Sequence, residues 1–162
     1  MPYYAGIGSR RRTPDYILNM MTVLSSKLEE NDYILRSGHA QGADTFFEAG
    51  VIHDEHKEIF TAKDATPQAI MTASEYHKYW DRCDEYTRKL HGRNVMIILG
   101  RKFNEPVKFV ICYTPDGKFS GGTGLGMQIA ETHGIPIFNL FYKSVRERLD
   151  KFIGVNEKVD LL

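Results

Sequence analysis

The chain has 162 residues, of which 42% are hydrophobic and 26% are charged, and its formal net charge is zero. This length and composition are ordinary for one globular domain, which we expect to span residues 1–162. The zero net charge argues against a dedicated DNA-binding domain, because such domains are usually basic. The chain has no apolar run long enough to cross a bilayer, so no membrane partner is expected.

A strand followed by a helix is predicted at the N-terminus. Residues 3–7 have strand composition and run into the glycine-rich segment Gly6-Ile7-Gly8-Ser9. Thr13 is expected to cap the helix that follows, with Pro14 at its first position, and Asn31 is expected to end it in a left-handed turn. The apolar residues of this helix recur at helical spacing and should cover a sheet: Ile17, Met21, Leu24 and Leu28.

Strand and helix patterns alternate through the rest of the chain. Residues 95–99 are apolar and fit either a strand or a buried helix. Alternation favours parallel pairing, so we predict an α/β fold with a Rossmann-like parallel sheet and helices on both faces. Ligands bind such sheets outside the carboxyl ends of the strands. The further predicted strands are 33–35, 57–61, 107–113 and 135–140, and the helices are 43–51, much of 66–90 and 127–132.

Two glycine-rich turns have the features of a phosphate site. In Ser120-Gly121-Gly122-Thr123-Gly124 the glycines allow close approach of a ligand, and the helix that follows offers unpaired N–H groups. The same turn could instead serve only tight strand-to-helix packing. In Gly6-Ile7-Gly8-Ser9-Arg10, Ser9 can donate a hydrogen bond and Arg10 can bind a phosphate through two N–H groups. Arg11 and Arg12 are interpreted as solvated.

A third turn, Ser37 to Asp44, carries candidate acid–base groups. Asp44 lies at a predicted helix start, and Glu48 follows one turn later on the same face. Two carboxylates repel a phosphate, so they suit ribose hydroxyls or a glycosidic bond, unless Asp44 only caps the helix and Glu48 is solvated. His39 is expected to be hydrogen-bonded rather than to bind a ligand.

Two further patterns are assigned structural roles. The His53-Asp54-Glu55-His56 segment lacks a trusted zinc spacing, and no metal or cofactor is predicted. An aromatic stripe at helical spacing should pack against the sheet, although it could stack a base: Tyr76, Tyr79, Trp80, Cys83 and Tyr86.

The order of these motifs resembles the SLOG superfamily, which joins the Lonely Guy phosphoribohydrolases and the DprA-like DNA-processing proteins. The segment 37–44 and the Arg93-Asn94 pair are most similar to DprA, and the resemblance covers nearly the whole chain. It implies that Arg93 to Leu99 is helical and that the protein forms homodimers or higher oligomers. It also implies one phosphate pocket, built from Gly8, Ser9, Arg10, Ser37, Gly38, Asp44, Arg93, Asn94, Gly121, Gly122, Thr123 and Gly124.

One position departs from the phosphoribohydrolase pattern. Gln128 stands where that pattern has its catalytic glutamate, and an amide cannot act as a carboxylate base; Glu131 follows one turn later. The main hypothesis is therefore binding of a nucleoside phosphate or another nucleotide-derived small molecule. The alternatives are cleavage of an N-glycosidic bond, with Asp44, Glu48 or Glu131 replacing the missing glutamate, and binding of single-stranded DNA.

Cysteine content and the N-terminal residues point to one compartment. Cys83 and Cys112 are too few for a secreted disulfide scaffold, and Cys112 lies in an apolar strand-like run. Met1-Pro2-Tyr3-Tyr4 lacks the basic and then apolar layout of a signal peptide. We therefore expect a cytoplasmic protein.

Overall fold

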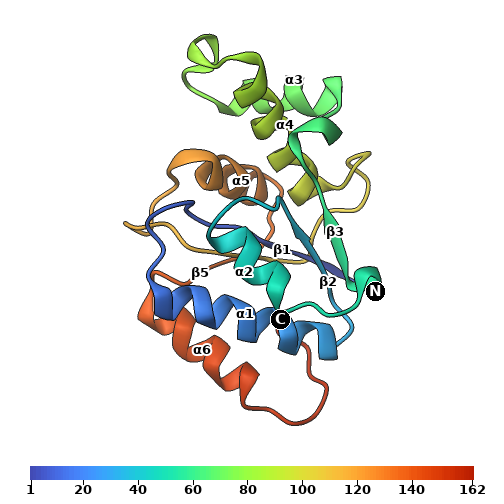
Figure 1. The fold of residues 1–162 in the computed structure, drawn as a ribbon, viewed down its shortest axis with the longest axis vertical. Helices are drawn as coiled ribbons and strands as arrows, with labels where there is room; N and C mark the ends of the chain where they lie inside the picture. The colour runs from blue at the N-terminus through green and yellow to red at the C-terminus, as the bar shows by residue number, and fades with distance from the viewer.

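Five short strands form one parallel sheet in the order β3-β2-β1-β4-β5 (Figure 1). The computed structural model describes all residues 1–162. Every neighbouring pair of strands is parallel, so each connection crosses over the sheet, and the predicted Rossmann-like α/β fold is confirmed. The strands are β1 Tyr3–Gly6, β2 Ile34–Ser37, β3 Lys57–Ile59, β4 Val110–Cys112 and β5 Ile137–Asn139.

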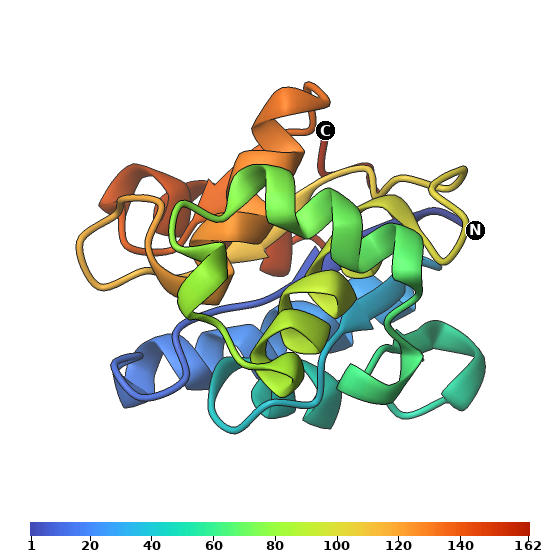
Figure 2. The same cartoon turned by 90° about the horizontal axis from the view of Figure 1, so that it is seen from above.

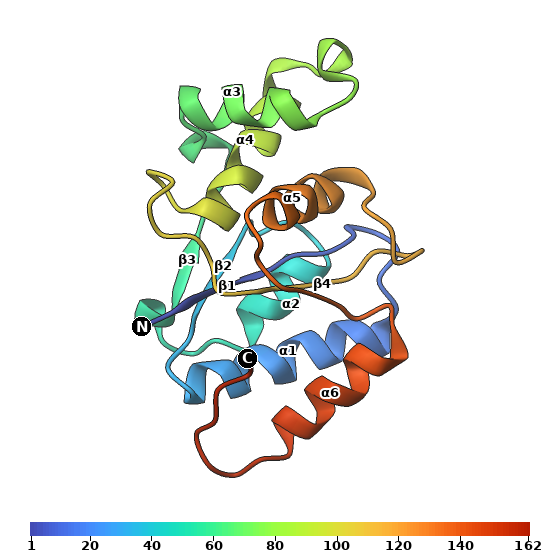
Figure 3. The same ribbon diagram turned by 180° about the vertical axis from the view of Figure 1, so that it is seen from behind.

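Helices cover both faces of this sheet, as Figures 1 and 3 show from opposite sides. One face carries α1 Asp15–Glu30, α2 Ala43–Ala49 and α6 Lys143–Ile153. The other carries α4 Glu85–Leu99 and α5 Gly121–Thr132, and α3 Pro67–Tyr76 packs against these two helices. The view from above shows α3 (green) and the start of α4 in front of the rest of the molecule (Figure 2). Three short 3-10 helices complete the chain: η1 Asp54–His56, η2 Ala62–Asp64 and η3 Trp80–Arg82.

The central strands β1 and β4 are buried on both faces, which explains their apolar composition. Tyr4 and Ile111 belong to the core under α1, whereas the adjacent Ala5 and Val110 belong to the core under α4 and α5. Successive side chains of a strand point to opposite faces, so the central strands β1 and β4 contribute to both cores. The residues predicted from the period of the first helix are all fully buried: Ile17, Met21, Leu24 and Leu28.

Both predicted ends of the first helix are wrong in detail. Pro14, rather than Thr13, is the N-cap residue, because the Thr13 hydroxyl donates to the carbonyl of Ser9 (3.0 Å). Asn31 has φ −95°, and the left-handed residue is Asp32 with φ 64°. The Asn31 side chain instead donates to the Lys27 carbonyl and accepts a hydrogen bond from the N–H of Val159.

The disputed apolar segment is helical. Residues 93–99 form the last two turns of α4, as the motif resemblance implied, and Val95 to Leu99 are all buried. The segment looks like a strand in sequence because the end of this helix is enclosed by the core. The Ser120–Gly124 segment also differs from its prediction, because α5 begins at Gly121 and most of the glycine run is therefore helical. The sequence interpretation did not include α6.

Glu29, near the end of α1, holds the loop that follows α2. Its carboxylate accepts the backbone N–H groups of Ile52 (3.0 Å) and His53 (2.9 Å), and it lies 3.1 Å from the Nδ1 atom of His56. Burial opposes ionisation of this carboxyl, but the hydrogen bonds from His53 and Ile52 prevail and lower the pKa of Glu29 to about 2. The ionised carboxylate therefore stabilises the fold.

We expect Glu29→Gln to lower the free energy of unfolding at pH 7 by about 2 kcal/mol, because an amide replaces a charge-assisted acceptor. A carboxylate with a lowered pKa stabilises the fold above its unfolded pKa, near 4.5, and this stabilisation is lost as the pH falls toward about 2. Urea unfolding of both proteins at pH 7, 4 and 3 measures the effect. A difference that stays constant over this range would contradict the assigned role.

Candidate functional site

A pocket of about 700 Å³ opens where the strands end. It is lined by residues that directly follow β1, β2, β3 and β4, such as Gly8, Gly38, Thr61 and Thr114. β1 and β4 are neighbours, but α1 and α5, which follow them, lie on opposite faces of the sheet. Ligands bind at such a topological switch point, and the volume is that of a small-molecule site.

The first turn of α5 forms part of the pocket wall. Gly121, Gly122 and Thr123 all line the cavity, and the first N–H groups of a helix have no partner inside it. Gly121 has φ +64°, a conformation that favours glycine. The N-cap residue Ser120 makes no side-chain capping bond, so it does not satisfy these N–H groups. The helix end can therefore bind an anion.

The loop after β1 adds positive charge and donors to the same cavity. Ser9, Arg10 and Arg12 line it, and both arginines are exposed. Arg12, which was interpreted from the sequence as solvated, is exposed and also lines the pocket. Arg11 is exposed and does not line the pocket. Two guanidinium groups and a helix N-terminus therefore border one cavity.

Arg93 is buried and holds two strand ends together. Its Nη1 atom donates to the carbonyl oxygens of Gly38 (2.6 Å) and Phe60 (3.1 Å), and its Nε atom donates to Asn94 Oδ1 (2.9 Å). The Asn94 amide in turn lies 3.4 Å from the carbonyl oxygen of Gly122. Arg93 thus connects the β2 and β3 loops, while Asn94 extends the network to α5.

Asp44 is the only carboxylate among the lining residues. It is buried, and its Oδ2 atom accepts the N–H of Ala40 (3.3 Å). Burial raises the pKa of Asp44 to about 6, although the Arg93 guanidinium and the backbone N–H groups of Ala40 and Gly38 favour the charged form. Near neutral pH this carboxyl can hold or release a proton, and it can accept a hydrogen bond from a ligand hydroxyl group.

The other predicted carboxylates lie outside the cavity. Glu48 is paired with His39, whose Nδ1 atom is 2.6 Å from Glu48 Oε2, and only His39 lines the pocket. Glu131 is exposed on α5 and does not line the pocket, and neither does Gln128. The predicted pair of Asp44 and Glu48 is therefore split between the pocket and the surface.

Two predicted pocket residues lie beside the pocket and help to shape it. Ser37 is fully buried, and its hydroxyl donates to the carbonyl of Gly6 (2.6 Å), which joins β2 to β1. A Cβ atom on Gly124 would lie 2.5 Å from the carbonyl carbon of Phe119, so glycine allows the chain to pass closely there. The predicted residues that line the cavity are Gly8, Ser9, Arg10, Gly38, Asp44, Arg93, Asn94, Gly121, Gly122 and Thr123.

The first half of α4 contributes lining residues that the sequence interpretation missed. Tyr86, Leu90 and His91 face the cavity, and burial lowers the pKa of His91 to about 4. Tyr76 and Trp80 pack against the core, as predicted for the aromatic stripe. Tyr86 is 63% exposed and borders the pocket, so packing against the sheet is wrong for this residue. The stripe is not on one helix, because α3 ends at Tyr76, η3 spans Trp80–Arg82 and α4 begins at Glu85. Tyr79 is 51% exposed, so packing against the sheet is wrong for this residue as well.

The sheet order and the pocket at the switch point define a Rossmann-like α/β domain. A solved structure with this fold is the X-ray structure of DNA processing protein A (DprA) from Streptococcus pneumoniae, with a TM-score of 0.56 and 19% sequence identity. The match covers 99% of this chain and 59% of that one, so the chain spans well under two thirds of the length of DprA. This likeness confirms the fold that the motifs implied.

Comparisons of the sequence with known proteins identify no family for this chain. No protein-family model matches the chain, and no curated protein matches it. No helix is both long and apolar enough to span a membrane.

Proposed function

We propose that this protein binds a nucleoside phosphate in the pocket at the switch point. The observation that carries the proposal is the meeting of the α5 N-terminus with Ser9, Arg10 and Arg12 around one cavity that also contains a buried carboxyl. The helix end and the arginines suit a phosphate, because each supplies N–H donors and positive charge. Asp44 suits a hydroxyl group of the sugar, which a free phosphate ion or a simple carboxylate lacks.

The remaining lining residues suit the base. Ile7, Leu90 and Ile97 give the cavity an apolar part, and the ring of Tyr86 borders it. A nucleotide combines an anion, hydroxyl groups and a flat apolar ring, so it matches all three parts of the wall. Ligand pockets of this size usually combine apolar walls with a few placed polar groups.

Calorimetric titration with nucleoside monophosphates tests the proposal. We expect binding of a 5′-monophosphate and at least about tenfold weaker binding of the same nucleoside without its phosphate, because charge-assisted contacts contribute about 1.5–3 kcal/mol. Equal affinities, or no binding across the four common bases, would contradict the proposal.

The likeness to DprA favours a second candidate, binding of single-stranded DNA. Titration with oligonucleotides of increasing length, at low and high salt, separates it from the first. A mononucleotide site gives an affinity that is independent of strand length, whereas a DNA groove gives an affinity that rises with length and falls steeply with salt.

We expect little or no release of free base from nucleoside monophosphates. Asp44 is the only carboxylate in the cavity wall, and the position where the phosphoribohydrolase pattern has its catalytic glutamate is Gln128. Gln128 cannot replace that glutamate, because an amide neither donates nor accepts the required proton. Chromatography of long incubations with adenosine monophosphate measures the product. Base release at about one turnover per second, lost in Asp44→Asn, would show that the protein is an enzyme.

A further inference from the structure

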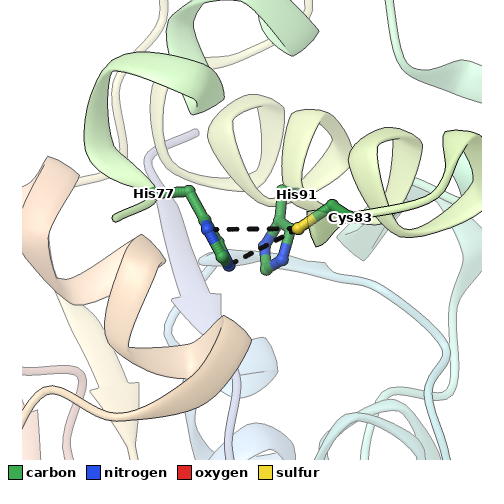
Figure 4. A group of neighbouring side chains, drawn as sticks. All are labelled: His77, Cys83 and His91. Atoms are coloured by element: carbon green, nitrogen blue, oxygen red, sulfur yellow. Dashed lines mark hydrogen bonds between the residues drawn. The ribbon is translucent and has the colours of Figure 1, made fainter. Parts of the chain in front are cut away.

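We infer that His77, Cys83 and His91 form a binding site for one zinc ion. Their potential ligand atoms all lie within 4.8 Å of one another, and each residue comes from a different part of the chain: the end of α3, the end of η3 and the second turn of α4. Figure 4 shows the three side chains turned toward a common point. The spacing of these residues in sequence matches no familiar zinc motif, so only the fold reveals the group.

The distances are close to those of a tetrahedral site. Zinc binds nitrogen at about 2.0 Å and sulfur at about 2.3 Å, so its ligand atoms lie roughly 3.3–3.7 Å apart. The Sγ atom of Cys83 is 3.8 Å from His77 Nε2 and 4.0 Å from His77 Nδ1. The rings of His77 and His91 have centroids 4.5 Å apart. An inward shift of about 1 Å for the widest pair would complete the set.

An orphaned polar atom points to a ligand. The Nδ1 atom of His91 is buried and has no hydrogen-bond partner, and His91 as a residue is only 8% exposed. Buried polar atoms are almost always satisfied, because an unpaired one costs free energy. The ring of Trp80 lies 6.1 Å from that of His77 and 6.2 Å from that of His91, and it helps to shield the group from water. A metal ion that His91 binds through Nδ1 would satisfy this nitrogen.

The second cluster of potential ligands lacks this feature. Glu29, His53 and His56 also lie within 4.8 Å of one another. There, however, the carboxylate already accepts two backbone N–H groups and contacts both histidines. That cluster is satisfied by the chain itself, so it serves as the control.

Zinc binding removes a proton from Cys83 and moves a ring proton within His77. The Cys83 thiol loses its proton to solvent, because the thiolate is the metal ligand. His77 Nδ1 accepts the Tyr79 N–H (3.1 Å), so coordination through Nε2 moves the ring proton to Nδ1 and releases that N–H. Tyr79 is 51% exposed, and water can take over this bond. Three protein ligands leave the fourth position to water or to another ligand.

The bound ion would connect the 77–84 loop to α4. His91 lines the nucleotide pocket, and α3 with the start of α4 extends away from the sheet in Figure 1. A metal at this point would hold the first half of α4, which lines the pocket through Tyr86, Leu90 and His91.

Titration of the untagged full chain with Co²⁺ and then Zn²⁺, under reducing conditions, tests the inference. We expect one Co²⁺ per chain, with a thiolate-to-cobalt absorption band that Zn²⁺ abolishes by displacement. Cys83→Ser should remove the band. Both Cys83→Ser and His77→Gln should weaken metal binding at least about tenfold, because even the loss of a residue that only orients a metal ligand costs about 10–100-fold in affinity. The double variant His53→Gln and His56→Gln should bind as the wild type does.

Alkylation of the wild type gives a readout that requires no variant. Zn²⁺ should slow the reaction of partly buried Cys83 with iodoacetamide, and a chelator should restore it, while the fully buried Cys112 reacts only on unfolding. The inference is overturned by an absence of stoichiometric binding, by full binding in both Cys83→Ser and His77→Gln, or by loss of binding in the His53 and His56 variant alone.

Discussion

Gly122→Asp should weaken nucleotide binding at least about tenfold while the protein stays folded. The new carboxylate would lie where the first N–H groups of α5 border the pocket, and it would repel the phosphate and occupy its space. A Cβ atom at this position would lie 3.2 Å from the side-chain amide of Asn94 and near no backbone atom, so a small shift of that amide accommodates the side chain. An acidic residue in the first turn of a helix also stabilises that helix.

Gly122→Asn is the matched control, because it has nearly the same size without the charge. Calorimetry with the monophosphate and thermal melts of the three proteins separate affinity from stability. If charge matters most, the asparagine variant retains more affinity than the aspartate variant. Wild-type affinity in a folded Gly122→Asp protein would mean that this helix end does not bind the phosphate.

Asp44→Asn should change the pH dependence of stability by about 3 kcal/mol. The pKa of Asp44 is about 6 in the folded protein and near 3.8 when unfolded, so ionisation becomes harder on folding. A shift of about two pKa units corresponds to about 3 kcal/mol. The wild type loses this amount as the pH rises from 3.8 through 6, because the unfolded chain releases its proton first. The asparagine variant has no such loss.

Urea unfolding of wild type and Asp44→Asn at pH 4, 6 and 8 measures this difference. The stability of the variant relative to the wild type should rise over this range and then level off above pH 7. Asp81→Asn, at an exposed position, is the control and should track the wild type. A flat difference for Asp44→Asn would mean that the carboxyl ionises as easily in the fold as in the unfolded chain.

The sequence predicts the sheet well, because the alternation of strands with helices and the spacing of apolar residues within a helix both follow from which residues are buried. The spacing of apolar residues in α1 predicts that this helix covers the sheet. The glycine-rich segments after β1 and β2 predict the position of the pocket. Residues 93–99 show the limit of this approach, because a helix enclosed by the core has no polar face to give it a period. The motif order resolved this segment where composition could not.

The pocket wall was harder to predict, because local sequence does not fix where a side chain points. Arg12 and His91 carry no motif, and they reach the pocket only through the path of a loop and the docking of α4. Glu48 illustrates the opposite error, since helical spacing places it on the face of Asp44, yet His39 pairs with it outside the cavity. In the same way, only the folded structure brings Cys83 close to His77 and His91.

The most direct measurement is a crystal structure of the protein with a bound nucleoside monophosphate. The phosphate should lie within hydrogen-bond distance of the N–H groups of Gly122 and Thr123, with Arg10 or Arg12 on its outer side and a sugar hydroxyl facing Asp44. A nucleotide bound with its phosphate away from α5, or bound outside this pocket, would contradict the account.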